Sequence, residues 1–302
     1  MILAGITLLL LAIFGAPLFA VIVAGAILGF VRTGVDPMVV PMEIYRIAET
    51  PVLLAIPLFT FAGYLLGESR APQRLVRASD ALLGWIPGGL AVVGLVACAL
   101  FTAFTGASGI TIVALGALLY PALREAGYSE RFNLGLITTS GSLGLLFAPS
   151  LPLILYGIVA QQPIDKLFLA GILPGVLMLS MLSLWSVRAG RQVVAVRDGR
   201  RHPDFRELTG ALRAAVWEMP LPLIVLGGVY SGIFAVSEAA AVTVVYVFVV
   251  EVLIYREIPA RRLPGVMRES MIMVGGILII LGASLASTNY MIDAQIPMKL
   301  FD

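Results

Sequence analysis

A polar interruption stands at the centre of the longest uncharged stretch of the sequence. Residues 81–123 contain no Asp, Glu, Lys or Arg, yet the run FTAFTGASG at 101–109 holds two threonines, a serine and two glycines. Glycine permits unusual backbone conformations, and a broken helix frees carbonyl oxygens. These carbonyls and hydroxyls are hard oxygen donors that suit a small cation. The candidate cation-binding tip is therefore Thr105, Gly106, Ala107, Ser108 and Gly109.

A second interruption follows in TTSGSLGLLFAPSLPLILYG at 138–157. Its small polar residues are Ser140, Gly141, Ser142, Gly144 and Ser150. Pro149 and Pro152 interrupt the helical hydrogen-bond ladder. One interpretation is a proline-kinked helix. The other is a discontinuous helix whose second half begins near Pro149, where the positive end of its dipole suits a carboxylate while the carbonyl end of the first half suits a cation. Two polar breaks in neighbouring segments favour the second interpretation.

The composition requires a membrane around these residues. The 302-residue chain is 60% hydrophobic and 13% charged, with a mean hydropathy of +1.00. The net charge of +2 does not indicate a nucleic-acid partner, and the single cysteine, Cys98, excludes an intramolecular disulfide. An intramembrane enzyme would need a nucleophile–base pair or metal ligands. One histidine, one cysteine and no acid pair at depth argue against that chemistry and against a transition-metal site.

Several apolar segments are long enough to span a bilayer, so we expect an all-α polytopic membrane protein. The segments are Ile2–Val31, Pro51–Gly67, Ala81–Leu123, Phe132–Ile164, Leu167–Val187, Met219–Tyr255 and Ser270–Ile292. The loop from Arg188 to Arg213 has seven arginines against three acids and is predicted to be cytoplasmic. The basic loop around Arg74 then lies on the same side. Met219–Tyr255, with basic residues at both ends, is predicted to cross twice, with Glu238 near the outer turn.

Two structural alternatives concern the elements that position the polar runs. Leu90–Phe101 and Ile110–Leu123 are each about a dozen residues, which is too short to cross a ~30 Å core. They form either a re-entrant hairpin or, if extended, two full helices joined by a small-residue turn. Ile2–Val31 is either a short helical pair or one long tilted helix. The pair would make the weak resemblance between 14–30 and 234–250 an inverted repeat, which is the architecture of many secondary transporters.

The run FTAFTGASGITIVALGALLYPALREAGYSERFNLGLITTSGSLGLLFAPSLPLILYGIVAQQPIDKLFLAGILPGVLM at 101–178 resembles the large membrane subunit of TRAP transporters, the DctM-like permeases. IPLFTFAGYLL (56–66) and GGVYSGIFAVSEAAAVTVVY (227–246) extend the resemblance to nearly the whole chain. It implies an elevator-type, sodium-coupled carrier in the bacterial inner membrane, without a cofactor, that takes up organic acids such as C4-dicarboxylates. It also implies two partners, a small four-helix DctQ-like membrane subunit and a periplasmic DctP-like binding protein. The alternatives are a stand-alone anion symporter or exchanger of the same superfamily, and a non-transporting fragment.

The resemblance assigns parts of the chain to roles. Residues 1–80 correspond to first-repeat scaffold helices, 81–164 to part of the transport domain, 165–218 to a connecting helix with a basic loop, and 219–302 to an incomplete second repeat. Sodium coordination is carried over to Thr105, Gly106, Ser108, Gly109, Ser140, Gly141 and Ser142, mainly through backbone carbonyls. Ser108, Pro149 and Ser150 are the candidates for the substrate carboxylate.

The chain departs from the family pattern in three places. The family usually has a double proline where this chain has Ala148-Pro149, and Thr-Pro-Thr-Glu where it has Ala235-Val236-Ser237-Glu238. Family members also run more than a hundred residues further. We therefore expect the sequence to be a fragment that ends where the second hairpin would begin.

Overall fold

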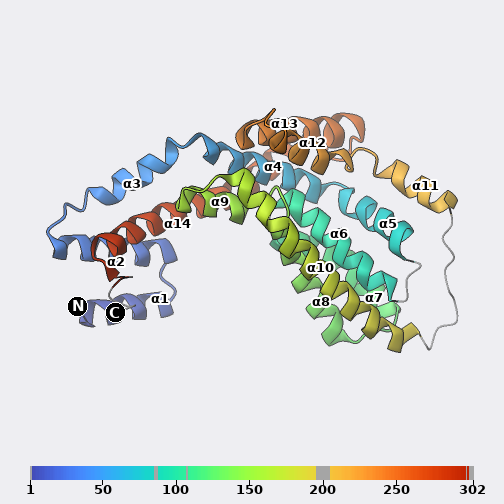
Figure 1. Cartoon of the computed structure of the whole chain (residues 1–302), viewed down its shortest axis with the longest axis horizontal. Coiled ribbons are helices and arrows are strands. Elements are labelled where there is room, and N and C mark those ends of the chain that lie inside the picture. Colours follow the sequence, from blue (N-terminus) through green and yellow to red (C-terminus); the bar gives the residue numbers. More distant parts are fainter. Residues whose placement is uncertain (1, 85–87, 107, 195–204, 297, 299–302) are drawn as a thin grey trace. The chain divides into compact units, whose positions relative to one another are not determined.

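The computed structural model describes residues 2–84, 88–106, 108–194, 205–296 and 298, and within these ranges every regular element is helical (Figure 1). The α-helices are α1 Ile2–Ile13, α2 Leu18–Thr33, α3 Val39–Ala48, α4 Ala55–Glu68, α5 Ala71–Leu83, α6 Gly89–Thr105, α7 Ser108–Glu125, α8 Glu130–Leu143, α9 Leu151–Ala160, α10 Ile164–Val194, α11 Phe205–Ala214, α12 Pro220–Tyr230, α13 Val236–Phe248 and α14 Leu263–Asp293. Short 3-10 turns, η1 Pro51–Leu54 and η2 Gly144–Leu146, precede α4 and follow α8, and a π-helical turn, η3 Val249–Ile254, extends α13.

The described helices confirm a multi-pass membrane protein. Four helical segments are long and apolar enough to span a bilayer, and they are Pro51–Glu68, Ile164–Gly190, Val236–Ile254 and Leu263–Asp293. A fifth span is possible if the bent pair Glu130–Leu146 and Leu151–Ala160 counts as one. Many apolar side chains on these helices are exposed, as lipid-facing side chains are, including Leu173, Leu184 and Leu253.

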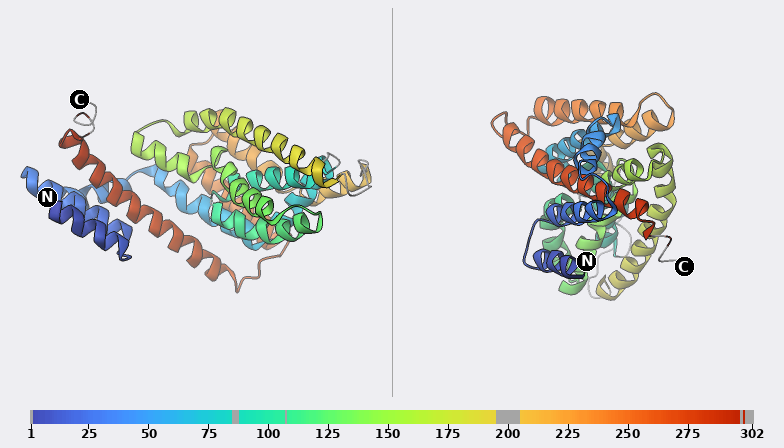
Figure 2. Two further views of the ribbon diagram at one scale, coloured as in Figure 1. Left: turned by 90° about the horizontal axis from the view of Figure 1, so that it is seen from below. Right: turned by 90° about the vertical axis from the view of Figure 1, so that its left-hand side faces the viewer.

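The chain divides into two compact units. Unit 1 contains Met1–Leu53 and Met271–Asp302, and unit 2 contains Leu54–Ser270. In unit 1 the predicted split of the first apolar segment is confirmed, because α1 ends at Ile13 and α2 begins at Leu18 after a turn at Gly15 (Figure 2). Phe30 of α2 packs edge-on against Tyr290 of α14, with the ring centroids 5.6 Å apart.

Unit 2 is built around the hairpin α6–α7, with α8, α10 and α4 packed along it (Figure 1). Its core is apolar and fully buried, with Leu95 and Phe101 of α6 and Leu115 and Leu119 of α7 at its centre. Ala81, which sequence analysis placed at the start of the hairpin segment, belongs to the separate amphipathic helix α5, because the hairpin begins only at Gly89.

The segment Met219–Tyr255 forms the expected pair of helices, α12 and α13. Glu238 lies in the first turn of α13, and its carboxylate accepts the backbone N–H of Ala235 at 2.8 Å. A carboxylate at a helix N-terminus satisfies a backbone donor and complements the helix dipole. Glu238 therefore has a structural role as a helix cap.

An ion cluster joins α5 to the ends of α12 and α13 in unit 2. Arg74 contacts Glu218, Glu251 at 2.9 Å and Glu257 at 2.6 Å, and its guanidinium lies 4.1 Å from the ring centroid of Tyr255. Glu251 and Glu218 are buried. Burial alone would lower the pKa of Arg74, but Glu251 and Glu218 outweigh it, so its pKa is raised. Burial also raises the pKa of Glu218, against the pull of Arg74.

Candidate functional site

The tip of the hairpin is tighter than the sequence suggested. Thr105 is the last residue of α6, and Ser108 is already the first residue of α7, so Thr105, Ser108 and Gly109 are helical rather than unwound. Gly106 ends α6 in the left-handed region, with φ of +63°, and donates its N–H to the carbonyl of Thr102 at 2.7 Å. A left-handed glycine terminates a helix within one residue. Ala107 lies outside the described residues.

Three threonine hydroxyls gather one turn below this tip. The Thr102 hydroxyl hydrogen-bonds the Thr111 hydroxyl at 2.7 Å and the Gly141 carbonyl at 3.1 Å, and the hydroxyls of Thr105 and Thr111 are 3.4 Å apart. All three threonines are fully buried. We call Thr102, Thr105, Thr111 and the Gly141 carbonyl the threonine cluster. It brings oxygen atoms from α6, α7 and α8 to one place without any ionisable side chain.

Close backbone approach holds α8 against the hairpin. A Cβ on Gly141 would lie 2.5 Å from the Ile112 side chain and 3.3 Å from the carbonyl oxygen of Ser108. A Cβ on Gly144 would overlap the Ala99 carbonyl and lie 2.7 Å from the backbone nitrogen of Ala103. Only glycine fits at these two positions, so the glycines of the second polar run allow α8 to end beside the hairpin tip.

The second polar run is a discontinuous helix, as predicted. α8 ends at Leu143, η2 follows, and α9 begins at Leu151 with its axis turned by 47°. Ser140, Gly141 and Ser142 still belong to α8, so these predicted site residues lie just before the break. The second half begins at Leu151, close to the predicted start near Pro149. Ser150 is the N-cap, because its hydroxyl accepts the N–H of Leu153, and Pro152 occupies the first turn, where a helix can dispense with an N–H.

Four helix ends therefore converge in unit 2. The C-terminal ends of α6 and α8 meet the N-terminal ends of α7 and α9 (Figure 1). The contacts show this directly. A Cβ on Gly106 would lie 2.7 Å from Leu151 Cγ, and the carbonyl of Ser108 lies near Gly141. C-terminal ends carry partial negative charge and N-terminal ends partial positive charge. The crossing point thus offers a favourable position to a cation and another to an anion.

The tip lies beside the interior of α4. A Cβ on Gly63 would lie 2.5 Å from Thr105 Cα, and one on Gly67 would lie 3.0 Å from the side chain of Ile110. Gly63 is twelve residues from Pro51, the far end of the candidate span Pro51–Glu68, which corresponds to roughly 18 Å. The tip therefore stops well short of that end of the span. From the tip, α9 runs on for another 10 residues.

The sequence-predicted residues differ in how they join this site. Thr105, Gly106 and Gly141 are buried in it, and Ser108 is half-buried at its edge. Ser140 is buried, but its hydroxyl donates to Ile137 within α8 at 3.1 Å. Gly109 and Ser142 are exposed and outside the threonine cluster.

Pro149 and Ser150 are buried at the break between α8 and α9. The Ser150 hydroxyl donates to the carbonyl of Leu145 and accepts the N–H of Leu153 at 3.5 Å. These two hydrogen bonds are those of a helix cap.

Sequence analysis missed Thr102 and Thr111. Each lies three residues from a predicted site residue, Thr102 from Thr105 and Thr111 from Ser108, and helical residues three apart share a face. This three-residue spacing could have identified Thr102 and Thr111 as part of the site. It was overlooked because the tip was expected to be unwound over five residues, which would have removed the helical periodicity.

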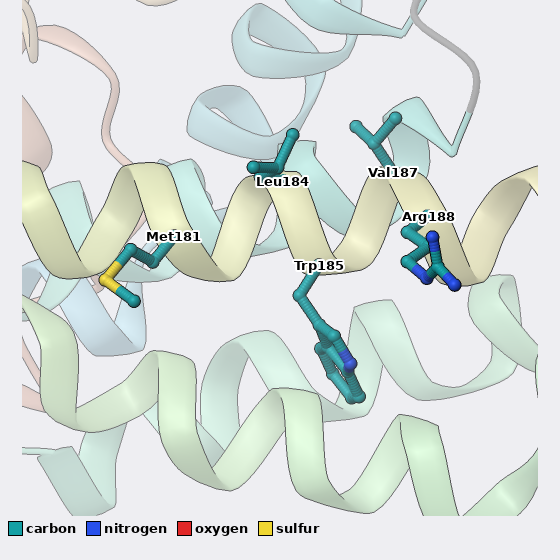
Figure 3. A pocket seen from close by; sticks show the side chains of 5 residues that line it. All are labelled: Met181, Leu184, Trp185, Val187 and Arg188. Carbon is teal, nitrogen blue, oxygen red and sulfur yellow. The ribbon is translucent and has the colours of Figure 1, made fainter.

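A hollow along α10 is not a comparable site. Figure 3 shows Met181, Leu184, Trp185, Val187 and Arg188 around it, all on one helix. Trp185 points toward the neighbouring helix, where its ring lies 5.1 Å from that of Phe132 in α8. Met181, Leu184 and Trp185 are exposed apolar side chains on a candidate span. Such a surface suits contact with lipid tails or another apolar helix rather than a polar ligand.

Broken helices whose ends meet around uncharged oxygen donors are typical of secondary transporters. The comparisons with known proteins name the family. The family described as "Tripartite ATP-independent periplasmic transporter, DctM component" matches residues 5–302, and the chain belongs to it.

Characterised relatives are similar over most of the chain. The ectoine/5-hydroxyectoine TRAP transporter large permease protein of Ruegeria pomeroyi is 31% identical over 98% of this chain and 69% of its own length. The C4-dicarboxylate TRAP transporter large permease protein of Rhodobacter capsulatus is 32% identical over 90% of this chain and 64% of its own length. The isethionate TRAP transporter permease protein of Oleidesulfovibrio alaskensis is 35% identical over 68% of this chain and 32% of its own length. These relatives are transporter permeases and not enzymes, and the chain spans about two thirds or less of their length.

Proposed function

We propose that this chain is the greater part of the large permease subunit of a sodium-coupled secondary transporter that takes up an organic anion. The observation that carries the proposal is the convergence of four helix ends around the threonine cluster. We further propose that the hairpin is re-entrant, because its tip contacts Gly63 in the interior of the span Pro51–Glu68. Irregular backbone at that depth needs protein or a water-filled cavity around it.

The cation would bind at the carbonyl ends of α6 and α8. The donors near these ends are the hydroxyls of Thr102 and Thr111 and the carbonyls of Gly141 and Ser108. Neutral hard oxygens suit an alkali cation, whereas transition metals favour imidazole or thiolate. The described residues contain no group of three or more His, Cys, Asp or Glu side chains that could hold a metal ion. Na⁺ is the alkali ion that the family resemblance implies.

The anion would bind at the N-terminal ends of α7 and α9. The end of α9 offers few donors, because Pro152 lacks an N–H and the N–H groups of Leu153 and Ile154 are bonded to Ser150. Ser108, half-buried at the start of α7, is therefore the stronger substrate candidate than Ser150. The relatives' names include a dicarboxylate, an ectoine and a sulfonate, so a small molecule with an anionic group is the substrate class that we propose.

The family assignment also supports the remaining proposals. The permease would work in the bacterial inner membrane with a small four-helix subunit and a periplasmic substrate-binding protein. Substrate would cross by an elevator-type movement of the part of the chain that contains the hairpin and the broken helix.

The test is uptake into proteoliposomes that contain the complete permease and its small subunit, with the binding protein added outside. We expect uptake that requires an inward Na⁺ gradient and the binding protein. Thr102→Val combined with Thr111→Val should abolish the sodium dependence, and Ser108→Trp should abolish uptake. Thr243→Val is the matched control, because Thr243 is also buried but its hydroxyl, within the described part of the chain, donates to the carbonyl of Ala239 in its own helix at 2.7 Å. Normal sodium-driven uptake in the double valine variant would refute the proposed cation site. Uptake without any binding protein would favour a stand-alone symporter.

A further inference from the structure

We propose that a pocket at the cytoplasmic end of unit 2 binds the headgroup of an anionic phospholipid. The pocket has a volume of about 560 Å³ and lies between the start of α5, the end of α11 and the residues that follow η3. This volume falls within the range of small-ligand sites. The pocket is separate from the four helix ends, and none of its lining residues belongs to the threonine cluster.

Positive charge dominates the lining. Arg70, Arg77 and Arg213 line the pocket with exposed side chains, and none of the three has a carboxylate partner within the described ranges of the chain. Arg70 is the N-cap of α5, and Arg77 lies seven residues further on, about two turns into the helix. Arg70 and Arg77 from the start of α5 and Arg213 from α11 thus line one pocket, and their guanidinium donors suit a phosphate group.

The other charged groups of the pocket are already neutralised. Arg74 lies between Arg70 and Arg77 but is committed to the ion cluster. Glu257 lines the pocket, pairs with Arg74 at 2.6 Å and accepts the backbone N–H of Arg70 at 2.7 Å. The ion cluster therefore forms the rigid back wall of the pocket, and the three other arginines keep an uncompensated positive field.

The position of the pocket selects a lipid over a soluble anion. Arg70 follows the candidate span Pro51–Glu68 by two residues, and Tyr255 follows Val236–Ile254 by one. Both residues therefore lie at the level where phospholipid headgroups begin. The basic loop that includes Arg213 places this level on the cytoplasmic side, where anionic lipids attract basic residues.

Apolar side chains extend from the pocket toward the membrane. Val216 and Trp217 line it and are exposed, and Met219 and Leu223 continue as exposed apolar residues into α12. Trp217 is held in place, because the hydroxyl of Tyr246 donates to its carbonyl at 2.7 Å. Tryptophan is enriched at membrane interfaces. A headgroup phosphate among the arginines would thus leave its acyl chains along an apolar surface.

The test measures lipid binding to the complete permease by native mass spectrometry. We expect phosphatidylglycerol to bind more tightly than phosphatidylethanolamine. Each removed arginine should weaken binding of phosphatidylglycerol about fivefold, so Arg70→Gln, Arg77→Gln and Arg213→Gln together should weaken it roughly a hundredfold. The matched control removes Arg124, Arg131 and Arg261, three exposed arginines without ion-pair partners among the described residues, and should change affinity less than threefold.

A second variant separates charge from folding. The triple Arg→Lys variant at the same three positions keeps the charge and should retain most of the phosphatidylglycerol binding. Failure of this variant to bind phosphatidylglycerol would overturn the proposal. Equal affinities of the triple glutamine variant and its control for phosphatidylglycerol would overturn it as well. Displacement of phosphatidylglycerol by millimolar inorganic phosphate would reassign the pocket to a soluble anion. Loss of the bound lipid when the small membrane subunit is present would show that a protein covers this face instead.

Discussion

Replacing Arg74 by methionine should destabilise the permease more than any other single loss of charge on α5. Arg74 is the only cation in contact with three carboxylates within the described ion pairs, and two of them, Glu251 and Glu218, are buried. Removing one partner of a buried ion pair leaves an uncompensated charge and costs about 3–5 kcal/mol. At about 2–4 °C per kcal/mol for chains of moderate size, the midpoint of thermal unfolding should fall by roughly 6–20 °C.

The assay is thermal unfolding in one detergent, followed by tryptophan fluorescence. Arg46→Met is the matched control, because Arg46 pairs with Glu43 at 3.0 Å across one turn of α3 with 66% of its side chain exposed. Exposed pairs contribute at most about 1 kcal/mol. Adding Glu251→Gln to Arg74→Met should recover part of the loss, since the buried charge is then removed. Equal midpoints for Arg74→Met and Arg46→Met would show that the ion cluster does not stabilise the fold.

Three further predictions concern single positions. Burial raises the pKa of Glu218 above its ordinary 4.5, and its Oε2 has no hydrogen-bond partner among the described residues. The protonated carboxyl of Glu218 therefore stabilises the folded state fully below pH 4.5, and this stabilisation is lost as the pH rises through the raised pKa. The unfolding midpoint of the wild type should therefore fall relative to Glu218→Gln from pH 4.5 upward, and parallel pH profiles would contradict this. Gly144→Ala should cost about 1–3 kcal/mol or more and reduce the yield of monodisperse protein, because its Cβ would meet the backbone of α6. Gly135→Ala, in the preceding helix α8, has nothing within 4 Å of its Cβ and should be neutral, and equal yields for the two variants would refute the close contact. Ser150→Ala should lower the free energy of unfolding by about 0.5–2 kcal/mol, because α9 loses its cap. Ser129→Ala removes the exposed cap of α8 and should lower it by less. A larger drop in the unfolding midpoint for Ser129→Ala than for Ser150→Ala would exclude the capping role of Ser150.

The helical architecture could be predicted because lipid leaves few alternatives. Apolar length, basic loops and small-residue breaks indicated the spans, the pair α12–α13 and the break near Pro149, and they allowed a split of residues 2–31, which the structure places at Gly15. These features depend on local sequence, and in a membrane the backbone must satisfy its own hydrogen bonds nearly everywhere. Exact helix ends were less predictable. Helix α6 continues to Thr105 and ends at the single residue Gly106, and the N-cap of α9 is Ser150 rather than Pro149.

The site was predictable as a region but not as a set of contacts. Sequence placed two polar interruptions 30 to 40 residues apart, and the structure shows that Thr102 and Gly141 are in contact across that separation. Periodicity cannot reveal such a contact, because it depends on Gly144 letting one helix approach another closely. The ion cluster was equally hidden, since Arg74 is more than 140 residues from the glutamates that surround it.

The helix ends also indicate which ions the crossing point can hold. Each helix end carries about half an elementary charge, so the C-terminal ends of α6 and α8 together supply about one negative charge and the N-terminal ends of α7 and α9 about one positive charge. The threonine cluster adds oxygens but no charge. This balance fits one monovalent cation and one carboxylate better than a divalent cation, which would need ionised side chains. Because the two proposed binding positions share the same four helices, each ion would offset the field that repels the other, and this is the physical basis that we propose for uptake of an anion driven by a sodium gradient.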